Sequence, residues 1–396
     1  MPEFSTARLA RMHGVLAGHV ASGALPGLVA LVSRRGETHV HCLGTKQAGG
    51  AEPMRRDTIF RIASMTKPIA ATAAMILVEE CVLRLDEPLD RFLPELADRR
   101  VLRALHAPVD ETVPAWRPLT LRDLLTFRLG YGFIPAPPGQ YPIQKAIEAA
   151  GLAPGPQPTQ LAPDDWLRRL GSLPLAAQPG TRWLYHTGSD VLGILIARAS
   201  AKSFGAFLRE RLFEPLGMKD TGFFVPEQSL DRLATAYTAS AQAKSLEVWD
   251  AARGGMFSRP RPFESGGGGL VSTADDYLAF CRMLLGKGTL EGVRILSRPS
   301  VELMTTNQLS DAQRAEASLF FGESGGWGLG MAVSVGRTEL WGPGRFGWDG
   351  GYGTSGYSDP AENLVGVLLT QRLMESPEPP AVFRDFWTST YQALDG

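Results

Sequence analysis

Cysteine is scarce in this sequence, and the few cysteines lack the spacing of a structural framework. The 396 residues include three of them, Cys42, Cys81 and Cys281, far apart and odd in number. A disulfide-stapled fold needs paired cysteines, and a zinc site typically needs a C-x-x-C pattern, which the chain does not contain. We therefore expect a protein of a reducing compartment that uses no metal and no cofactor.

The sequence also has almost no net charge, few lysines and no apolar run long enough to span a membrane. The formal net charge of −1 gives no reason to expect a nucleic acid or an anionic membrane as a partner. No segment approaches the roughly 20 apolar residues of a membrane helix, and residues 1–20 lack the apolar stretch of a signal peptide. The expected location is cytoplasmic. Most of the 40 basic residues are arginine, so a lysine inside an apolar segment stands out.

The composition that remains is that of an ordinary globular enzyme, 44% hydrophobic and 20% charged. Residues 5–22 have the spacing of a helix, and residues 28–44 predict a β-hairpin. Residues 64–83 form a long apolar run, and at this length a buried helix is favoured over a strand. Further helices are expected at 119–130 and 188–214.

Three other segments predict loops or short strands. Residues 131–163 carry eight prolines and predict a long loop, either a lid over a pocket or an insertion that merely covers surface. The SGGGG run at 265–269 predicts a flexible join before a helix capped near Ser272 and Thr273. Beyond Gly326, Gly-rich turns alternate with short strands, expected at 327–335, 338–344 and 363–371.

The motif that points to chemistry is Ser64-Met65-Thr66-Lys67. Residues three apart on a helix share a face. Ser64 lies at the helix's N-terminal end, where free backbone N–H groups stabilise a developing oxyanion. Lys67 is followed by an apolar stretch, so it lies on a buried element, where desolvation lowers an amine pKa and prepares the amine to accept a proton from serine.

Around this pair the sequence resembles a known superfamily. RIASMTKPIAA resembles the nucleophile motif of class C β-lactamases, D-Ala-D-Ala carboxypeptidases and family VIII carboxylesterases. TRWLYHTGSDVLG resembles the second motif, Tyr-x-Asn or its variants, and FGWDGGYGTSGYSDP resembles the third, which is Lys-Thr-Gly in lactamases and Trp-Gly-Gly in the esterases. Supporting segments such as LTLRDLLTF and SGGGGLVSTADDY match in the same order along nearly the whole chain.

The resemblance assigns the expected site. It implies Tyr185 as the third catalytic side chain beside Ser64 and Lys67, with either Lys67 or Tyr185 as the base. It also implies an oxyanion hole made by the backbone N–H groups of Ser64 and Gly351. The expected substrate-binding residues are Trp348, Asp349, Gly350, Thr187, Tyr131 and Phe133.

Two other patterns are set aside. Ser324 satisfies G-x-S-x-G, but an α/β-hydrolase needs a histidine after the serine, and the last histidine is His186. Ser324 is therefore expected to be a loop residue. His186 adjoins Tyr185 and suggests a Ser-His-Asp triad, but in the family that position is usually small or polar and not catalytic. His39 and His41 alternate on a strand and lack a third metal ligand.

The departures from the lactamase motifs indicate the reaction. Trp348 stands where lactamases have the lysine that holds a substrate carboxylate, and Thr187 stands where they have asparagine. We therefore expect a small-molecule ester as substrate, cleaved through an acyl-enzyme. Acyl transfer to an alcohol, weak β-lactamase, D-amino-acid amidase or peptidase activity, and a catalytically silent binding protein stay open, as does homo-oligomerisation.

The resemblance also implies an α+β fold, with an antiparallel β-sheet flanked by helices plus a mostly helical domain. The sheet domain is expected to combine residues 1–85 and 265–396. The helical domain is expected at 86–264, with the insertion 131–163, and the active site in the cleft between the two domains.

Overall fold

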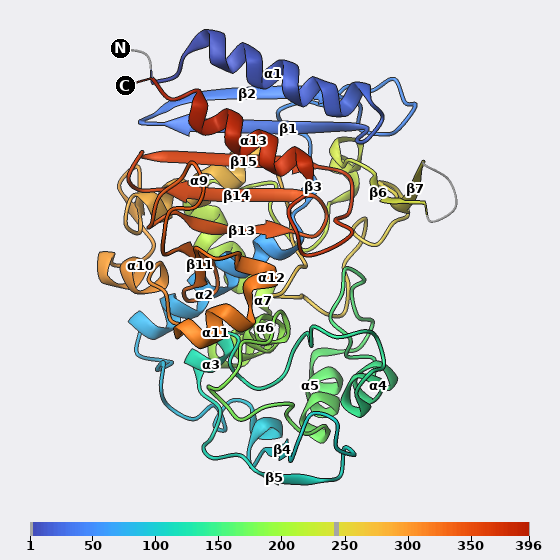
Figure 1. Ribbon diagram of the computed structural model, residues 1–396, viewed down its shortest axis with the longest axis vertical. Coiled ribbons are helices and arrows are strands. Elements are labelled where there is room, and N and C mark those ends of the chain that lie inside the picture. Colours follow the sequence, from blue (N-terminus) through green and yellow to red (C-terminus); the bar gives the residue numbers. More distant parts are fainter. Residues whose placement is uncertain (1–2, 241–244, 396) are drawn as a thin grey trace.

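The computed structural model describes residues 3–240 and 245–395. Within them the largest sheet has seven strands, in the order β11-β12-β13-β14-β15-β1-β2, all antiparallel to their neighbours. These strands are β1 (Gly27–Arg34), β2 (Glu37–Gly44), β11 (Gly325–Trp327), β12 (Ala332–Ser334), β13 (Phe346–Gly350), β14 (Thr354–Asp359) and β15 (Leu364–Thr370). The α+β fold with an antiparallel sheet flanked by helices is therefore confirmed (Figure 1).

Both faces of the sheet are covered because its central strands are apolar on both sides. All eight residues of β1 are buried. Alternate residues, Leu28 among them, pack with α1 (Thr6–Ala21) and α13 (Ala381–Gln392). The residues between them, Val29 among them, belong to the main core with α2 (Thr66–Glu79) and α9 (Ala274–Leu285). This alternation decides which side chains of a strand face the main core and which face α1 and α13.

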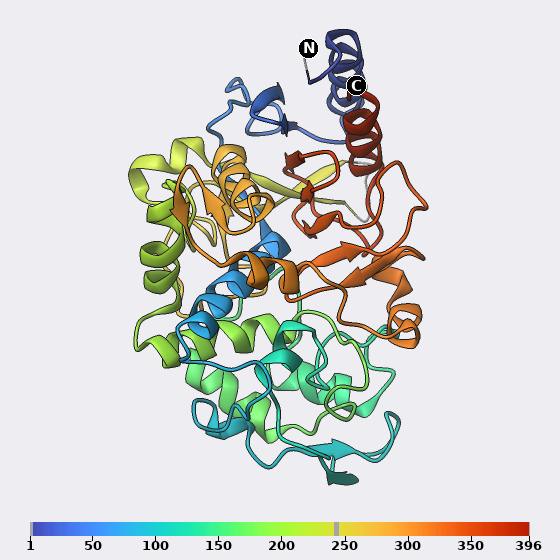
Figure 2. The same cartoon turned by 90° about the vertical axis from the view of Figure 1, so that its left-hand side faces the viewer.

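The first and last helices lie side by side, and the two chain ends meet at the same corner of the molecule (Figures 1 and 2). The Ser5 N–H donates to the carbonyl of Ala393 over 2.9 Å. The predicted helix 5–22 is confirmed by α1, with Leu9, Met12 and Leu16 buried as its spacing requires.

A mostly helical layer lies below the sheet in Figure 1. Its elements are α3 (Leu121–Leu125), α4 (Pro142–Ala149), α5 (Pro163–Ser172), α6 (Thr187–Ser200) and α7 (Phe204–Leu208), with the hairpin β4 (Arg100–Leu102) and β5 (Thr112–Pro114). The short helix α8 (Glu214–Leu216) packs against α9. The remaining elements are β3 (Phe60–Arg61), β6 (Ala236–Ala239), β7 (Leu246–Asp250), β8 (Val271–Ser272), β9 (Thr289–Leu290), β10 (Val293–Arg294), α10 (Arg298–Met304), α11 (Asp311–Glu316) and α12 (Ser318–Phe321).

Some expected boundaries differ from the structure. The helix expected at 188–214 is interrupted after α6, because Ala201 adopts the left-handed conformation with φ of 55°. The expected loop 131–163 contains α4, whose Pro142 occupies the first helical position, where a missing N–H is harmless. Residues 338–344, expected as a strand, form bends and a turn, so that expectation is wrong.

The division into residues 1–85 with 265–396 and residues 86–264 stays a prediction, but one part of it shifts. Val225, Leu230 and Phe257 share a hydrophobic cluster with Tyr352 and Leu373 at the end of the sheet. These contacts place the described residues of 225–240 and 245–257 on the sheet side, although the sequence assigned them to the helical domain.

Among the described residues no single helix has the length and hydropathy to cross a membrane. One pair, Thr187–Ser200 with Phe204–Leu216, passes that test jointly but is bent by 77°.

Candidate active site

Ser64 lies on a short 3₁₀ turn, Ala63–Met65, that leads into α2. The turn is held against the sheet from two sides. The Ile62 N–H donates to the carbonyl of Leu270 over 3.0 Å, and the carbonyl of Ile62 accepts from the Thr354 hydroxyl over 3.1 Å. Ser64 is half-buried, so its hydroxyl stays accessible on a fixed backbone.

Lys67 is fully buried one turn later, and its amine contacts three acceptors. Nζ lies 2.9 Å from Ser64 Oγ, 2.5 Å from the carbonyl of Gly267 and 3.3 Å from His186 Nδ1. Burial lowers the pKa of Lys67 to about 7, against a smaller opposing effect of Asp190. The amine is therefore neutral in a large fraction of molecules at neutral pH and is placed to accept the serine proton.

Tyr185 completes the predicted trio. Its hydroxyl accepts a hydrogen bond from the Trp348 indole over 2.5 Å and also bonds with Ser64, and Lys67 Nζ lies 4.5 Å from the centre of its ring. Burial raises the pKa of the phenol, and the bonds from Ser64 and Trp348 only partly offset this. The phenol is therefore protonated at rest, and Lys67 is the better matched of the two bases that the sequence left open.

The backbone of Tyr185 is tied to the start of the segment 131–163. The Phe133 N–H donates to the Tyr185 carbonyl over 2.9 Å. The ring of Phe133 packs edge to face with that of Phe320, 5.9 Å away. Phe133 thus lies beside Tyr185, and a substrate contact of Phe133 stays a prediction.

A wall of aromatic side chains surrounds Tyr185. The sequence analysis did not identify Phe320 and Phe321 as part of it. Phe320 on α12 lies 5.0 Å from Tyr185 and 5.0 Å from Trp183, and Phe321 lies 6.2 Å from Trp348. The adjacent aromatic residues at 320 and 321, a short distance before the third motif, were the available signal. The wall makes the surroundings of the phenol apolar.

The turn after β13 carries Gly351, whose N–H is predicted to be an oxyanion donor. The Gly353 N–H donates to the carbonyl of Gly350 over 2.9 Å, which fixes the peptide plane that carries the Gly351 N–H. A Cβ at Gly350 would lie 2.3 Å from the carbonyl of Ile62, whereas a Cβ at Gly351 would meet no atom within 4 Å. The strand therefore touches the residues just before Ser64 at Gly350, and the space beside Gly351 is open.

Asp349 does not face the catalytic residues. Its register partner is Ser355, and Ser355 pairs onward with Leu368, on the face covered by α13. The Tyr357 hydroxyl donates to the Asp349 carboxyl over 3.3 Å. Burial raises the pKa of Asp349 to about 6. Strand alternation puts Trp348 on the opposite face, so the expectation that Asp349 contacts substrate is wrong for this arrangement.

Two further predicted contacts are buried. Tyr131 is 1% exposed within the main core. Thr187 opens α6 and is also 1% exposed. Tyr131 therefore does not reach the molecular surface, and a substrate contact of Thr187 stays a prediction.

The run 265–269 is not a flexible join, contrary to expectation. The hydroxyl of Ser265 and the N–H of Gly267 both donate to Asp190, over 2.6 and 3.0 Å. A Cβ at Gly266 would lie 2.2 Å from the carbonyl of Ser189, and one at Gly267 would lie 2.9 Å from the ring of His186. Glycine is required because this backbone packs directly on the start of α6 and reaches Lys67.

His186 and Asp190 were not predicted as site residues, yet they lie beside the amine. His186 Nε2 lies 3.2 Å from Asp190 Oδ2, and its other ring nitrogen faces Lys67. The sequence did contain a signal for this pair. His186 and Asp190 are four residues apart at the start of a predicted helix, next to Tyr185, and this spacing puts two side chains on one helix face.

Ser324 lies in a turn before β11, and its hydroxyl pairs with that of Thr338 over 2.7 Å. Among residues 3–240 and 245–395 there is no group of three or more His, Cys, Asp and Glu side chains that could hold a metal ion.

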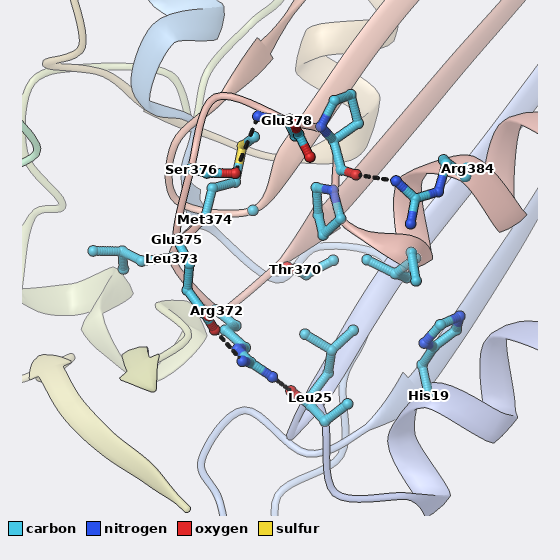
Figure 3. Close-up of a pocket in the computed structure, with 16 residues that line it drawn as sticks. His19, Leu25, Thr370, Arg372, Leu373, Met374, Glu375, Ser376, Glu378 and Arg384 are labelled. Atoms are coloured by element: carbon cyan, nitrogen blue, oxygen red, sulfur yellow. Dashed lines mark hydrogen bonds and ion pairs between the residues drawn. The ribbon is translucent and has the colours of Figure 1, made fainter. Parts of the chain in front are cut away.

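A separate cavity of about 380 Å³ lies between α1 and the segment that follows β15, lined by Arg372, Arg384 and His19 among others (Figure 3). Two of its arginines are bonded to neighbouring lining or adjacent residues. Arg372 bonds with Glu375 and the Ala24 carbonyl, and Arg384 bonds with the Pro379 carbonyl. None of the predicted site residues lines it.

The chain is similar to known proteins over most of its length. A family model described as Beta-lactamase matches residues 12–384. Protein Rv1367c of Mycobacterium tuberculosis is 40% identical over 361 residues, which are 88% of this chain and 86% of that protein. Esterase EstB of Burkholderia gladioli is 32% identical over 399 residues, 94% of this chain and 92% of that protein.

A solved structure also matches over nearly the whole length. EstCE1, described as a hydrolase with promiscuous acyltransferase activity, superposes with a TM-score of 0.81 at 25% identity, over 97% of this chain and 99% of that one.

Proposed function

The chain belongs to the serine β-lactamase-like superfamily, and from that membership we propose that it is a carboxylesterase that forms an acyl-enzyme on Ser64. The observation that carries the proposal is the Trp348 indole, which occupies the position of the lactamase lysine and binds the hydroxyl of Tyr185. An indole offers one N–H and an apolar face, and it provides no charge to hold a substrate carboxylate. A neutral ester fits this wall better than an anionic β-lactam.

The proposed acylation follows from the distances. Ser64 Oγ attacks the ester carbonyl while its proton moves to Lys67 Nζ, 2.9 Å away. The N–H groups of Ser64 and Gly351 bind the carbonyl oxygen as it becomes negative. When the intermediate collapses, the Tyr185 phenol gives its proton to the leaving alkoxide and regains one from the Lys67 ammonium.

The proposed deacylation uses the same groups with water in place of serine. Water gives a proton to the neutral amine of Lys67 as it attacks the acyl-enzyme carbonyl, and the acid leaves as Ser64 recovers that proton. No net proton is consumed by the side chains over the full cycle.

Two p-nitrophenyl esters, the acetate and the butyrate, test the proposal. We expect turnover by the wild-type protein and its loss in Ser64→Ala. Ser324→Ala is the matched control. It removes the serine of the G-x-S-x-G pattern, which we expect to have no catalytic role, and it should keep full activity. Rapid quenching followed by mass spectrometry should show the acyl group on the peptide that contains Ser64. An inactive wild-type protein would sink the proposal, as would equal activity in the two alanine variants.

Nitrocefin separates esters from β-lactams. We expect its turnover to be much weaker than that of the esters, because the third motif lacks the cationic anchor. Comparable kcat/KM values for nitrocefin and p-nitrophenyl butyrate would contradict the assignment to esters.

Acyl transfer to an alcohol is the second candidate, and one contact favours it. The hydroxyl of Tyr352, next to Gly351, donates to the carbonyl of Pro156 over 3.2 Å. The segment 131–163 therefore reaches the oxyanion turn, where it can limit access of water to an acyl-enzyme. The name of EstCE1 records transfer beside hydrolysis in a relative.

The test adds acceptor alcohols to the p-nitrophenyl butyrate assay and quantifies the new ester against free butyrate. Tyr352→Phe removes the bond to Pro156 and keeps the ring. We expect a lower ratio of transfer to hydrolysis in this variant. An unchanged ratio would reject the role of the segment.

A further inference from the structure

The side of the Lys67 amine that faces away from Ser64 is closed by one imidazole. His186 Nδ1 lies 3.3 Å from Lys67 Nζ, and His186 Nε2 lies 3.2 Å from Asp190 Oδ2. The three side chains form a continuous chain of polar contacts that ends at the nucleophile. His186 immediately precedes α6, and Asp190 lies in the first turn of that helix.

Asp190 fixes which nitrogen of His186 carries the hydrogen. Its other oxygen, Oδ1, already accepts from the Ser265 hydroxyl and the Gly267 N–H. Burial alone would raise the pKa of Asp190, but the charge and hydrogen bonds of its partners, His186 first, hold it below its usual value. The ionised Oδ2 can only accept, so Nε2 carries the hydrogen and the lone pair of Nδ1 faces Lys67.

The backbone at His186 is strained to hold this position. Its φ of 85° and ψ of −64° belong to a γ-turn, and the turn is closed by the bond from the Thr187 N–H to the Tyr185 carbonyl, 3.3 Å. This conformation is rare and strained for any residue with a side chain. It places the phenol of Tyr185 and the ring of His186 on two sides of the same amine.

We propose that His186, held by Asp190, is a positioning residue that orients the neutral amine of Lys67 toward Ser64. The inference rests on the proposed function, because it concerns proton removal from the same serine. A neutral amine has two N–H bonds and one lone pair in roughly tetrahedral directions. The carbonyl of Gly267 and Nδ1 of His186 take the two N–H bonds, which leaves the lone pair directed at the Ser64 hydroxyl.

In the resulting step the O–H bond of Ser64 breaks and a third N–H bond forms on Lys67. The new ammonium then has one hydrogen for each of its three acceptors. No proton passes to His186, whose Nε2 hydrogen stays on the bond to Asp190. A Ser-His-Asp triad would instead require His186 to contact the serine, and its contact is with the amine.

The reactivity of Ser64 toward a fluorophosphonate probe tests the proposal without any ester. Two variants at one position separate the acceptor from the backbone. His186→Gly relieves the strained turn and removes the acceptor. His186→Asn tolerates positive φ and puts its amide oxygen close to the place of Nδ1, so it retains an acceptor for Lys67.

We expect His186→Gly to be labelled roughly ten to a hundred times more slowly than wild type, the effect of a misplaced catalytic group. A thermal melt of this variant, measured alongside, shows whether it is folded. We expect His186→Asn to recover most of the labelling rate. Equal labelling of wild type and His186→Gly overturns the proposal, and so does an equal loss in both variants.

A second measurement follows the charge at Asp190. The groups that face the Lys67 amine are the hydroxyl of Ser64, the ring of Tyr185, His186 and, through His186, Asp190. Removing the carboxylate in Asp190→Asn should move the acid limb of the labelling rate to lower pH, because a nearby negative charge favours the protonated amine. Asp276→Asn, a buried carboxylate on α9 that binds the Asp220 N–H, is the control and should leave the limb in place. An unmoved limb in Asp190→Asn contradicts the link through His186.

The carboxylesterase proposal and the His186 proposal would be contradicted by different results. If wild-type Ser64 is labelled rapidly and the ester assays are negative, the substrate assignment is wrong while the test of His186 stays intact. If the esters are hydrolysed and the His186 variants behave like wild type, the positioning pair is wrong and the carboxylesterase proposal stands.

Discussion

The indole N–H of Trp348 donates to the hydroxyl of Tyr185 across 2.5 Å. The two residues come from different layers, Trp348 from β13 of the sheet and Tyr185 from the segment just before α6. The bond therefore joins the sheet to the helical layer at the phenol that is proposed to protonate the leaving group. In the proposed mechanism this bond would stabilise negative charge on the phenol oxygen, which develops only during the reaction.

Replacing Trp348 with phenylalanine should lower kcat by about tenfold, because a donor to a developing charge is lost. The ring remains in its aromatic cluster, so the thermal unfolding midpoint should change little. Steady-state kinetics with p-nitrophenyl butyrate, together with a thermal melt, checks both expectations.

Trp327→Phe is the matched control for this substitution. Its indole donates to the carbonyl of Leu125 over 3.0 Å, away from the reacting hydroxyl. We expect it to affect stability more than kcat. A larger fall in kcat for Trp327→Phe than for Trp348→Phe would refute the role of the Trp348 bond.

The activity should rise with pH through about 7, the value to which burial lowers the pKa of Lys67. Below that value the buried amine binds a proton and cannot accept the one from Ser64. The kcat/KM for p-nitrophenyl acetate, measured against pH and corrected for spontaneous hydrolysis, should show this acid limb. Lys67→Arg, which cannot lose its proton, should lose at least about a hundredfold in kcat/KM at every pH.

An acid limb centred near the ordinary carboxyl value of about 4 would contradict the assignment of the base. The same holds if Lys67→Arg retains activity at high pH.

Gly350 and Gly351 are adjacent, and the structure predicts opposite outcomes for them. Gly350→Ala would bring a Cβ to 2.3 Å from the Ile62 carbonyl and 2.2 Å from Thr354 Oγ1. We expect a loss of about 1–3 kcal/mol in unfolding free energy from overpacking, and roughly a hundredfold loss in kcat as the oxyanion turn shifts.

Gly351→Ala is the control for Gly350→Ala, because the new Cβ would enter open space. Its unfolding free energy should stay within about 0.5 kcal/mol of wild type, the range for harmless substitutions. Urea unfolding and ester kinetics on both variants decide the matter. Equal effects of the two substitutions would show that the contact with Ile62 is unimportant.

Asp349→Asn should raise stability at neutral pH and leave ester hydrolysis nearly unchanged. Burial raises the folded-state pKa of this carboxyl from 3.8 to about 6. Its folded form thus binds more protons than the unfolded chain between these values, and stability falls as pH rises through that window. The amide avoids this loss, because it carries no charge at any pH.

Thermal melts of wild type and Asp349→Asn should therefore separate at about pH 7.5 and converge near about pH 4, where both forms are uncharged at this position. A gap that widens on acidification would have the wrong sign. A large rise in KM would return Asp349 to the substrate site.

The sequence was most informative where chemistry is fixed by short motifs. Ser64 and Lys67 are three residues apart, and any helix brings them together. Tyr185 and Trp348 could be placed only through the resemblance, because nothing in their spacing relates them to Ser64. The antiparallel sheet flanked by helices followed from the same resemblance, and the family assignment bears it out.

The errors have local physical causes. Flexibility was expected of the run 265–269, but glycine also permits close packing, and here the backbone presses on His186 and Ser189. The eight prolines of 131–163 concealed α4, since Pro142 at a first helical position favours a helix. Asp349 was expected to contact substrate because it stands in the third motif, whereas alternation along the strand puts it on the face opposite Trp348.

The position of β15 in the sheet constrains the order in which the chain can fold. This strand lies between β14 and β1, so that Leu28 faces Thr370 across nearly the whole chain. During synthesis the N-terminal hairpin must wait for the last strand before its open edge is paired, and contacts so distant in sequence are slow to form. We expect the polypeptide to depend on chaperones until β15 has paired with β1.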